Sequence, residues 1–142
     1  MIFFVILLDQ ASKAFALRVL SIHQSVPVIQ GLFHLTLVHN TGIAFGFFRE
    51  HPGLLLVLIT LSLLLLGVWA VRMENPSPGG RLAFALILGG AVGNWIDRLR
   101  FGSVIDFLDF RVWPVFNIAD SAITIGVVWY LLILMRGKKQ PL

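Results

Sequence analysis

Two carboxylates in the last third of the chain, Asp106 and Asp120, have the residue type and the setting for acid–base chemistry. They are joined by a short apolar segment that ends at Pro114 and Asn117, so both can reach one point. Two carboxylates at one point cannot both ionise cheaply, so one pKa rises and a proton is shared. One carboxylate can then take a proton from water while the other protonates a carbonyl oxygen, as in aspartic proteases. The pair therefore predicts hydrolysis by an activated water.

Each of these two residues also has an ordinary structural explanation. Asp120 comes just before an apolar stretch, where it could cap a helix N-terminus for about 1 kcal/mol. Asp106 could be a turn residue in an exposed loop, although Asp109, which can pair with Arg111, fits that description better. The chemical hypothesis depends on the two carboxylates meeting.

Asp9 and Lys13 form a second polar group, inside an apolar segment at the start of the chain. They are one helical turn apart, which is the spacing of an ion pair on a helix. A charged group at the centre of a membrane helix costs about 2.5–3.5 kcal/mol on insertion scales, and such groups usually pair or mark function. The pair therefore either neutralises itself in lipid or supports a site, and the spacing alone leaves both open.

A third polar group follows a glycine-rich segment. Gly89 and Gly93 have the spacing that lets another helix backbone approach closely. Asn94 and Arg98 are one helical turn apart, and Asp97 lies directly before Arg98. The glycines alone indicate packing, but an Asn, an Asp and an Arg after them favour a functional role. The structural alternative for Arg98 is to reach the lipid headgroups.

Other catalytic chemistries lack their residues. The chain has no cysteine, which excludes thiolate chemistry and a disulfide scaffold. Its four histidines show neither the His-Glu-x-x-His pattern nor paired helical spacing. There is no Gly-x-Ser-x-Gly elbow and no phosphate-binding loop, and Ser12 cannot form a dyad with Lys13 because adjacent side chains on a helix diverge. We therefore expect no metal and no cofactor.

Composition places these groups in a membrane protein. Of the 142 residues, 58% are hydrophobic and 13% charged, which is too apolar for an ordinary soluble domain. The net charge of +4 comes from basic residues scattered between apolar blocks, not from the patch that nucleic acid requires. Because a span needs roughly 20 residues, we predict one all-α membrane domain over residues 1–142. Its four transmembrane helices are expected at about residues 1–20, 54–71, 82–98 and 119–135.

The longer connections, residues 21–53 and 99–118, are predicted to lie on the face opposite the termini. Alternating residues over 31–40 predict a strand of a small sheet, and the aromatics over 44–48 suit the membrane interface. Residues 101–117 are too polar to span and too apolar for a free loop, so they are expected to dip into the interface. The charges that flank the helices number five on each side, so they leave the orientation open, and the basic tail favours cytoplasmic termini only weakly.

In their order along the chain, these residues resemble the motifs of the lipoprotein signal peptidases, also called signal peptidase II. The resemblance covers essentially the whole chain. No single motif would be specific, but five in order on a four-helix hydropathy profile are. The five matching stretches are Asp9–Lys13, Asn40–Phe45, Gly89–Arg98, Val104–Phe107 and Phe116–Asp120.

The resemblance implies an aspartic endopeptidase of the bacterial inner membrane that cuts prolipoproteins just before the diacylglyceryl-modified cysteine of the lipobox. Its catalytic pair would be Asp106 and Asp120, with supporting roles for Lys13 and Asp97. Termini in the cytoplasm, an active site at the periplasmic or outer face and a sheet that cradles the substrate are also implied. The expected partners are prolipoproteins and membrane lipids, with the chain acting as a monomer. The implied substrate-binding residues are Asp9, Asn40, Asn94, Arg98 and Asn117.

Two other functions are weighed against this one. A small proton- or ion-coupled carrier also places Asp, Asn and Arg within the membrane. Such a carrier needs polar groups at mid-membrane, whereas here, apart from Asp9 and Lys13, they gather at one end. A non-catalytic membrane scaffold would leave the carboxylate cluster unexplained.

Overall fold

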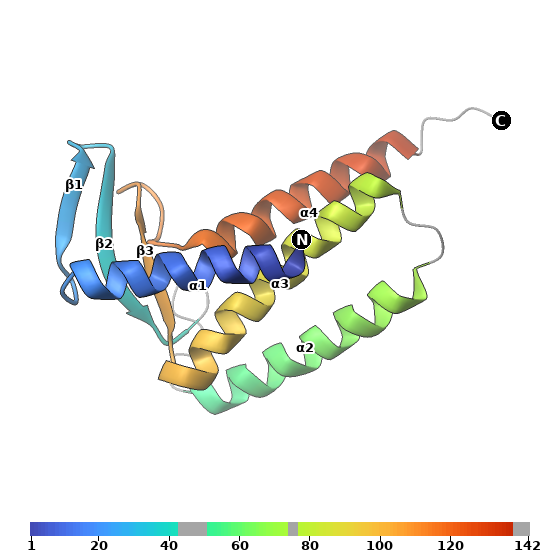
Figure 1. Ribbon diagram of the computed structural model, residues 1–142, viewed down its shortest axis with the longest axis horizontal. Coiled ribbons are helices and arrows are strands. Elements are labelled where there is room, and N and C mark those ends of the chain that lie inside the picture. Colours follow the sequence, from blue (N-terminus) through green and yellow to red (C-terminus); the bar gives the residue numbers. More distant parts are fainter. Residues whose placement is uncertain (43–50, 74–76, 138–142) are drawn as a thin grey trace.

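The computed structural model describes residues 1–42, 51–73 and 77–137, which form four helices and a three-stranded sheet (Figure 1). The predicted aromatic interface segment at 44–48 lies outside the described residues. The sheet lies at one end of the helices and the last turn of α4 at the other (Figure 1). The elements are α1 (Ile2–Val19), β1 (Ser25–Ile29), β2 (Phe33–Asn40), α2 (Pro52–Arg72), α3 (Pro78–Phe101), β3 (Val104–Asp109) and α4 (Ile118–Gly137).

Helix α3 is the centre of the bundle, since it packs against α1, α2 and α4. It begins four residues before the predicted start at residue 82. Pro78 suits the first turn of a helix, and the Ser77 hydroxyl accepts a hydrogen bond from the Gly80 amide at 3.1 Å. It ends at Gly102, whose φ of 68° is the left-handed conformation that glycine adopts most readily. Helix α2 packs mainly on α3 and runs apart from α1 and α4 (Figure 1).

Glycines permit the close approach of α3 to its neighbours. A Cβ on Gly89 would meet the Val5 side chain of α1 at 2.8 Å, and one on Gly90 would overlap the carbonyl oxygen of Ala119 in α4. Gly126 of α4 has the same relation to α3, because its Cβ would lie 2.7 Å from the Ala83 carbonyl oxygen. The small-residue packing predicted for this segment is therefore present. It determines how closely the first turn of α4 lies against α3.

We expect Gly90→Ala to lower the melting temperature of the protein in detergent and to slow catalysis, because the new methyl group displaces the start of α4. Overpacking of this kind costs about 1–3 kcal/mol. The matched control is Gly67→Ala in α2, where a Cβ would meet nothing within 4 Å. That change should leave the melting temperature equal or higher. Equal melting temperatures for the wild type and Gly90→Ala would contradict the packing described here.

The three strands form an antiparallel sheet in the order β1-β2-β3. The strand predicted over 31–40 is confirmed as β2. Strand β3, in the segment over 101–117 that was expected to dip into the interface, was not predicted as a strand. It pairs with β2 from His34 opposite Asp109 to Asn40 opposite Val104, and the interfacial position of the segment stays a prediction. Five of the six β3 residues are buried, so the strand lacks the one-sided alternation that identifies a half-buried strand. An apolar cluster joins this sheet to α1, and it comprises Ala16, Leu20, Leu37, Ile105 and Phe107.

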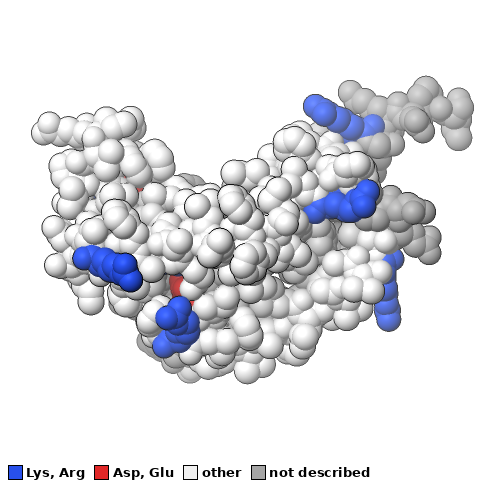
Figure 2. Space-filling view, viewed as in Figure 1, with Lys and Arg blue, Asp and Glu red and all other residues white. Residues whose placement is uncertain are grey.

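The surface is that of a membrane protein. In the part of the chain that the structure describes, three helical segments are long and apolar enough to cross a bilayer, namely Gly53–Arg72, Pro78–Phe101 and Ile118–Arg136. Helix α1 has 18 residues but carries Asp9, Lys13 and Arg18, so its crossing remains a prediction. On the face drawn in Figure 2, Lys and Arg side chains lie towards the two ends and uncharged residues fill the band between them.

Candidate active site

Asp106 of β3 and Asp120 in the first turn of α4 line one cavity of about 330 Å³. The chain turns back between them, because the Phe116 amide donates to the Leu108 carbonyl at 3.0 Å and the Leu108 amide donates to Phe116 at 2.8 Å. The side chains of Asn40, Asn94 and Arg98 line the same cavity. The structure thus brings the two predicted carboxylates to one place.

Asn117 links the two carboxylates. Its side-chain amide donates to Asp106 Oδ1 at 2.6 Å, and its Oδ1 accepts from the Asp120 backbone amide at 2.9 Å. In return, Asp120 Oδ2 accepts from the Asn117 backbone amide at 3.3 Å. These reciprocal bonds form the N-terminal cap of α4. Asp120 therefore takes part in capping the helix, which is the structural role considered for it from the sequence. Its second oxygen, Oδ1, accepts a hydrogen bond from Asn94.

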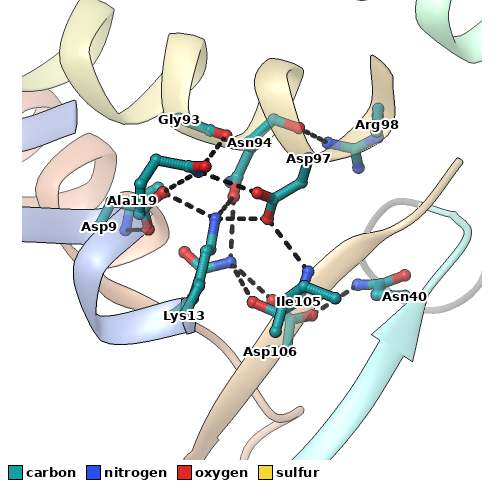
Figure 3. Close-up of polar contacts among 12 residues, drawn as sticks. Asp9, Lys13, Asn40, Gly93, Asn94, Asp97, Arg98, Ile105, Asp106 and Ala119 are labelled. Atoms are coloured by element: carbon teal, nitrogen blue, oxygen red, sulfur yellow. Dashed lines mark hydrogen bonds and ion pairs between the residues drawn. The ribbon is translucent and has the colours of Figure 1, made fainter. Parts of the chain in front are cut away.

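Lys13 is a buried cation, 2% exposed, with three acceptors around its amine (Figure 3). Its Nζ lies 2.8 Å from Asp9 Oδ2 and 2.7 Å from Asp97 Oδ2, and it donates to Asn94 Oδ1 at 2.9 Å. An ammonium has three donors, so all are used. The pairing of Asp9 with Lys13 is confirmed, and the contacts with α3 show that the pair does more than neutralise itself.

Asn94 connects this cluster to the carboxylate pair. Its Oδ1 accepts hydrogen bonds from Lys13 and, at 3.0 Å, from Asn117 Nδ2. Because its oxygen is held by two donors, its amide group must face the other way, and it donates to Asp120 Oδ1 at 2.7 Å. Lys13 thereby acts on Asp120 through one intervening side chain.

The carboxylates of Asp9 and Asp97 accept hydrogen bonds from backbone amides at two edges of the site. Asp9 Oδ1 accepts from the Ala119 amide at 2.9 Å, and Asp97 Oδ2 accepts from the Ile105 amide at 3.2 Å. Gln10 donates to Asp97 Oδ1 at 2.9 Å and was missed as a site residue, although it directly follows Asp9.

Two of the predicted substrate-binding residues lie behind the cavity wall. Asp9 and Asn117 are both 0% exposed, and neither lines the cavity. In this structure Asp9 bonds the start of α4 and Asn117 bonds Asp106 and Asn94, and a direct contact of either residue with substrate stays a prediction.

Asn40 and Arg98 form another wall of the cavity. Asn40 Nδ2 donates to Asp106 Oδ2 at 3.0 Å, and its Oδ1 accepts from the Gly42 amide at 3.1 Å. Arg98 donates to the Gly42 carbonyl at 3.0 Å, while its buried Nε has no partner among the residues that the structure describes. That N–H is a candidate donor to a bound carbonyl.

Burial raises the pKa of Asp106 from its ordinary 3.8 to about 7, and the nearby Asp120 carboxylate adds to the shift. Hydrogen bonds from Asn40 and Asn117 work in the opposite direction and keep the shift from being larger. Asp106 can therefore hold a proton near neutral pH, which is the condition for an acid and base pair made of two carboxylates.

The histidines do not contribute to this cavity. His39 Nδ1 lies 3.2 Å from Ser103 Oγ, and His34 Nδ1 lies 3.2 Å from Ser25 Oγ. Across residues 1–42, 51–73 and 77–137, no cluster of three or more His, Cys, Asp or Glu side chains could hold a metal ion.

Comparisons with known proteins agree on one family. A family model described as signal peptidase (SPase) II matches residues 1–136. The lipoprotein signal peptidase of Halothermothrix orenii is 42% identical over 137 residues, covering 95% of this chain and 92% of the relative. That of Moorella thermoacetica is 47% identical over 133 residues, covering 91% and 88%. A bacterial membrane enzyme solved by the in meso method at 2.3 Å resolution superimposes with a TM-score of 0.89 at 30% identity, covering 97% of this chain and 87% of that one.

Proposed function

The chain belongs to the signal peptidase II family, the lipoprotein signal peptidases, and we propose that Asp106 and Asp120 are its catalytic pair. It is a membrane peptidase that cleaves signal peptides from prolipoproteins. The observation that carries the residue assignment is the single cavity lined by both carboxylates, with Asn117 bonded to each.

In the proposed reaction, a water lies between the two carboxylates. Asp120, fixed by the Asn94 amide at 2.7 Å, takes a proton from this water. Asp106 carries the shared proton and gives it to the oxygen of the scissile carbonyl. The tetrahedral intermediate then collapses. Asp120 gives its proton to the leaving nitrogen, one hydroxyl of the intermediate returns a proton to Asp106, and the peptide bond breaks. No covalent bond to the enzyme forms at any step.

The other cavity residues are proposed to hold the peptide. Arg98 Nε has no hydrogen-bond partner among the described residues and Asn40 lies next to Asp106, so both can donate to backbone carbonyls beside the cut. A substrate must be extended at this point, because a helical segment uses its own carbonyls. Ile59, Leu63 and Leu66 of α2 supply the apolar side of the cavity for the signal segment.

We also propose the placement that the resemblance implied. The single domain lies in the bacterial inner membrane with four crossings, cytoplasmic termini and the active site at the outer face. This is supported by the position of the sheet, with Asp106 in β3, at the end of the bundle away from the last turn of α4 (Figure 1). One chain contains every residue of the proposed site, which supports action as a monomer.

The direct test uses purified protein and a synthetic precursor peptide whose lipobox cysteine carries a diacylglyceryl group. We expect cleavage immediately before that cysteine, and no cleavage of the same peptide without the lipid. The carrier alternative predicts proton or ion flux in liposomes instead. Flux without cleavage would overturn the peptidase assignment.

A further inference from the structure

A second cavity also reaches Asp120. It has a volume of about 420 Å³ and is bounded by the first turns of α4 and by the loop over residues 110–116. Asp120 lines this cavity and the active-site cavity alike. We propose that the second cavity binds one acyl chain of the diacylglyceryl group on the substrate cysteine. This inference rests on the proposed function.

One wall of the cavity is a fixed aromatic stack. The rings of Phe110 and Phe116 are stacked with their centroids 5.9 Å apart, and the Phe33 ring of β2 lies 4.9 Å from Phe110. The paired backbone bonds between Leu108 and Phe116 hold the loop on β3. The wall is therefore built by the fold and does not depend on a ligand.

The remaining wall favours hydrocarbon over peptide. It is formed on α4 by Ser121, Thr124 and Ile125, and the Ser121 hydroxyl already donates to the Asn117 carbonyl at 3.0 Å. A peptide strand placed here would bury amide groups with few partners, which is costly. An acyl chain needs none. Trp113, 65% exposed, lies at the same cavity and has the residue type that is enriched at membrane interfaces.

Because the second cavity lies next to Asp120, its expected occupant is the lipid of the substrate and not the signal helix. The scissile carbonyl must come within about 3–3.5 Å of the attacking water. The lipidated sulfur belongs to the residue just after the cut, so it is only a few bonds from that carbonyl and its lipid begins beside Asp120. A helix is about 10–12 Å wide with its side chains, so this cavity has roughly the volume of one turn and cannot hold a spanning segment.

The test compares two precursor peptides that differ only in acyl length, dipalmitoyl and dibutyryl, with Thr124→Trp as the filling variant. We expect Thr124→Trp to raise KM for the dipalmitoyl substrate at least tenfold and to leave kcat/KM for the dibutyryl substrate within threefold of wild type. Val128→Trp is the matched control, because Val128 is on the same helix, is 52% exposed and does not line the cavity. It should leave both substrates unchanged.

An equal loss on both substrates, or no loss on either, would overturn the acyl-chain assignment. If the Thr124→Trp protein fails to fold, Ile125→Phe takes its place, because it fills the same cavity with a smaller change. An equal loss on both substrates, or no loss on either, would again overturn the assignment. The wild type separates this inference from the proposed function. If it cleaves neither lipidated peptide, the function is wrong, whereas cleavage of both with no chain-length effect in the variants removes only the acyl site.

Discussion

Asp106→Asn abolishes cleavage of a lipidated precursor while leaving the protein inserted and folded. The expected loss in kcat is about 10³-fold or more, since general acid–base groups contribute about 10²–10⁴ and this one is half of a shared-proton pair. The matched control is Asp109→Asn, three residues further along β3. The Asp109 carboxylate pairs with Arg111 at 3.2 Å and accepts from Thr36 at 2.7 Å, outside the cavity. That variant should keep its cleavage rate within about threefold.

The same variant should show a pH signature in its stability. The pKa of Asp106 is about 7 in the folded protein, against 3.8 ordinarily, because burial and the Asp120 carboxylate favour the neutral form. Between these values the folded chain holds a proton that the unfolded chain has lost, so the contribution of Asp106 to stability falls as pH rises from about 4 to about 7. Asparagine does not titrate. The melting temperature of Asp106→Asn minus that of wild type should therefore rise between pH 5 and pH 8.

Two results would contradict this account. A normal cleavage rate in Asp106→Asn would remove the residue from the chemistry. A melting-temperature difference that is flat across this pH range would mean that Asp106 titrates as an ordinary surface carboxylate. Wild-type kcat/KM should also fall as pH rises past about 7, since the free enzyme then loses the proton that the pair must donate.

The sequence predicted the convergence of the carboxylates but not all of the sheet. The joining segment between Asp106 and Asp120 is short, and so the two had few ways to separate. Strand β2 was predicted from its alternation, whereas β3 is buried on both faces and gives no alternation. Strand β1 is exposed throughout and contains Pro27, a residue depleted from strands, so nothing in its pattern indicated a strand.

The contacts between distant side chains could not be predicted from spacing. Asp9 and Lys13 are neighbours on one helix, so their pairing followed from the helical repeat. The bond from Lys13 to Asn94 joins residues 81 positions apart, and only the packing of α1 on α3 brings them together. The same packing buries Asp9 and directs its Oδ1 to the Ala119 backbone amide at the start of α4, a contact that its spacing in the sequence did not indicate.

Lys13→Met separates the structural and the positioning roles of this buried cluster. Removing the cation leaves Asp9 and Asp97 buried without their counter-charge, and breaking a buried pair in this way costs about 3–5 kcal/mol. We therefore expect a large fall in melting temperature together with a loss of cleavage. That result alone could come from misfolding, so it requires a second variant.

The double variant Asp9→Asn with Lys13→Met restores the net charge of the cluster. With both pairs formed, the charges of Asp9, Lys13 and Asp97 sum to −1, and with Asp9 and Lys13 neutral, Asp97 alone also gives −1. Replacing both members of the Asp9–Lys13 pair is often close to neutral for stability, so the loss in melting temperature that comes from unpaired Asp9 should be recovered. The loss that comes from Asp97, which stays buried without Lys13, should remain. The Asn94 amide then has one donor on its oxygen instead of two, and its hold on Asp120 weakens. Cleavage should stay depressed, by up to about 10²-fold in kcat, with KM nearly unchanged. Recovery of kcat along with stability would show that Lys13 only balances the charge of Asp9. If Lys13 instead aligns Asp120 through Asn94, neutralising Asp9 cannot restore that alignment, because the contact from Lys13 to Asn94 is still missing.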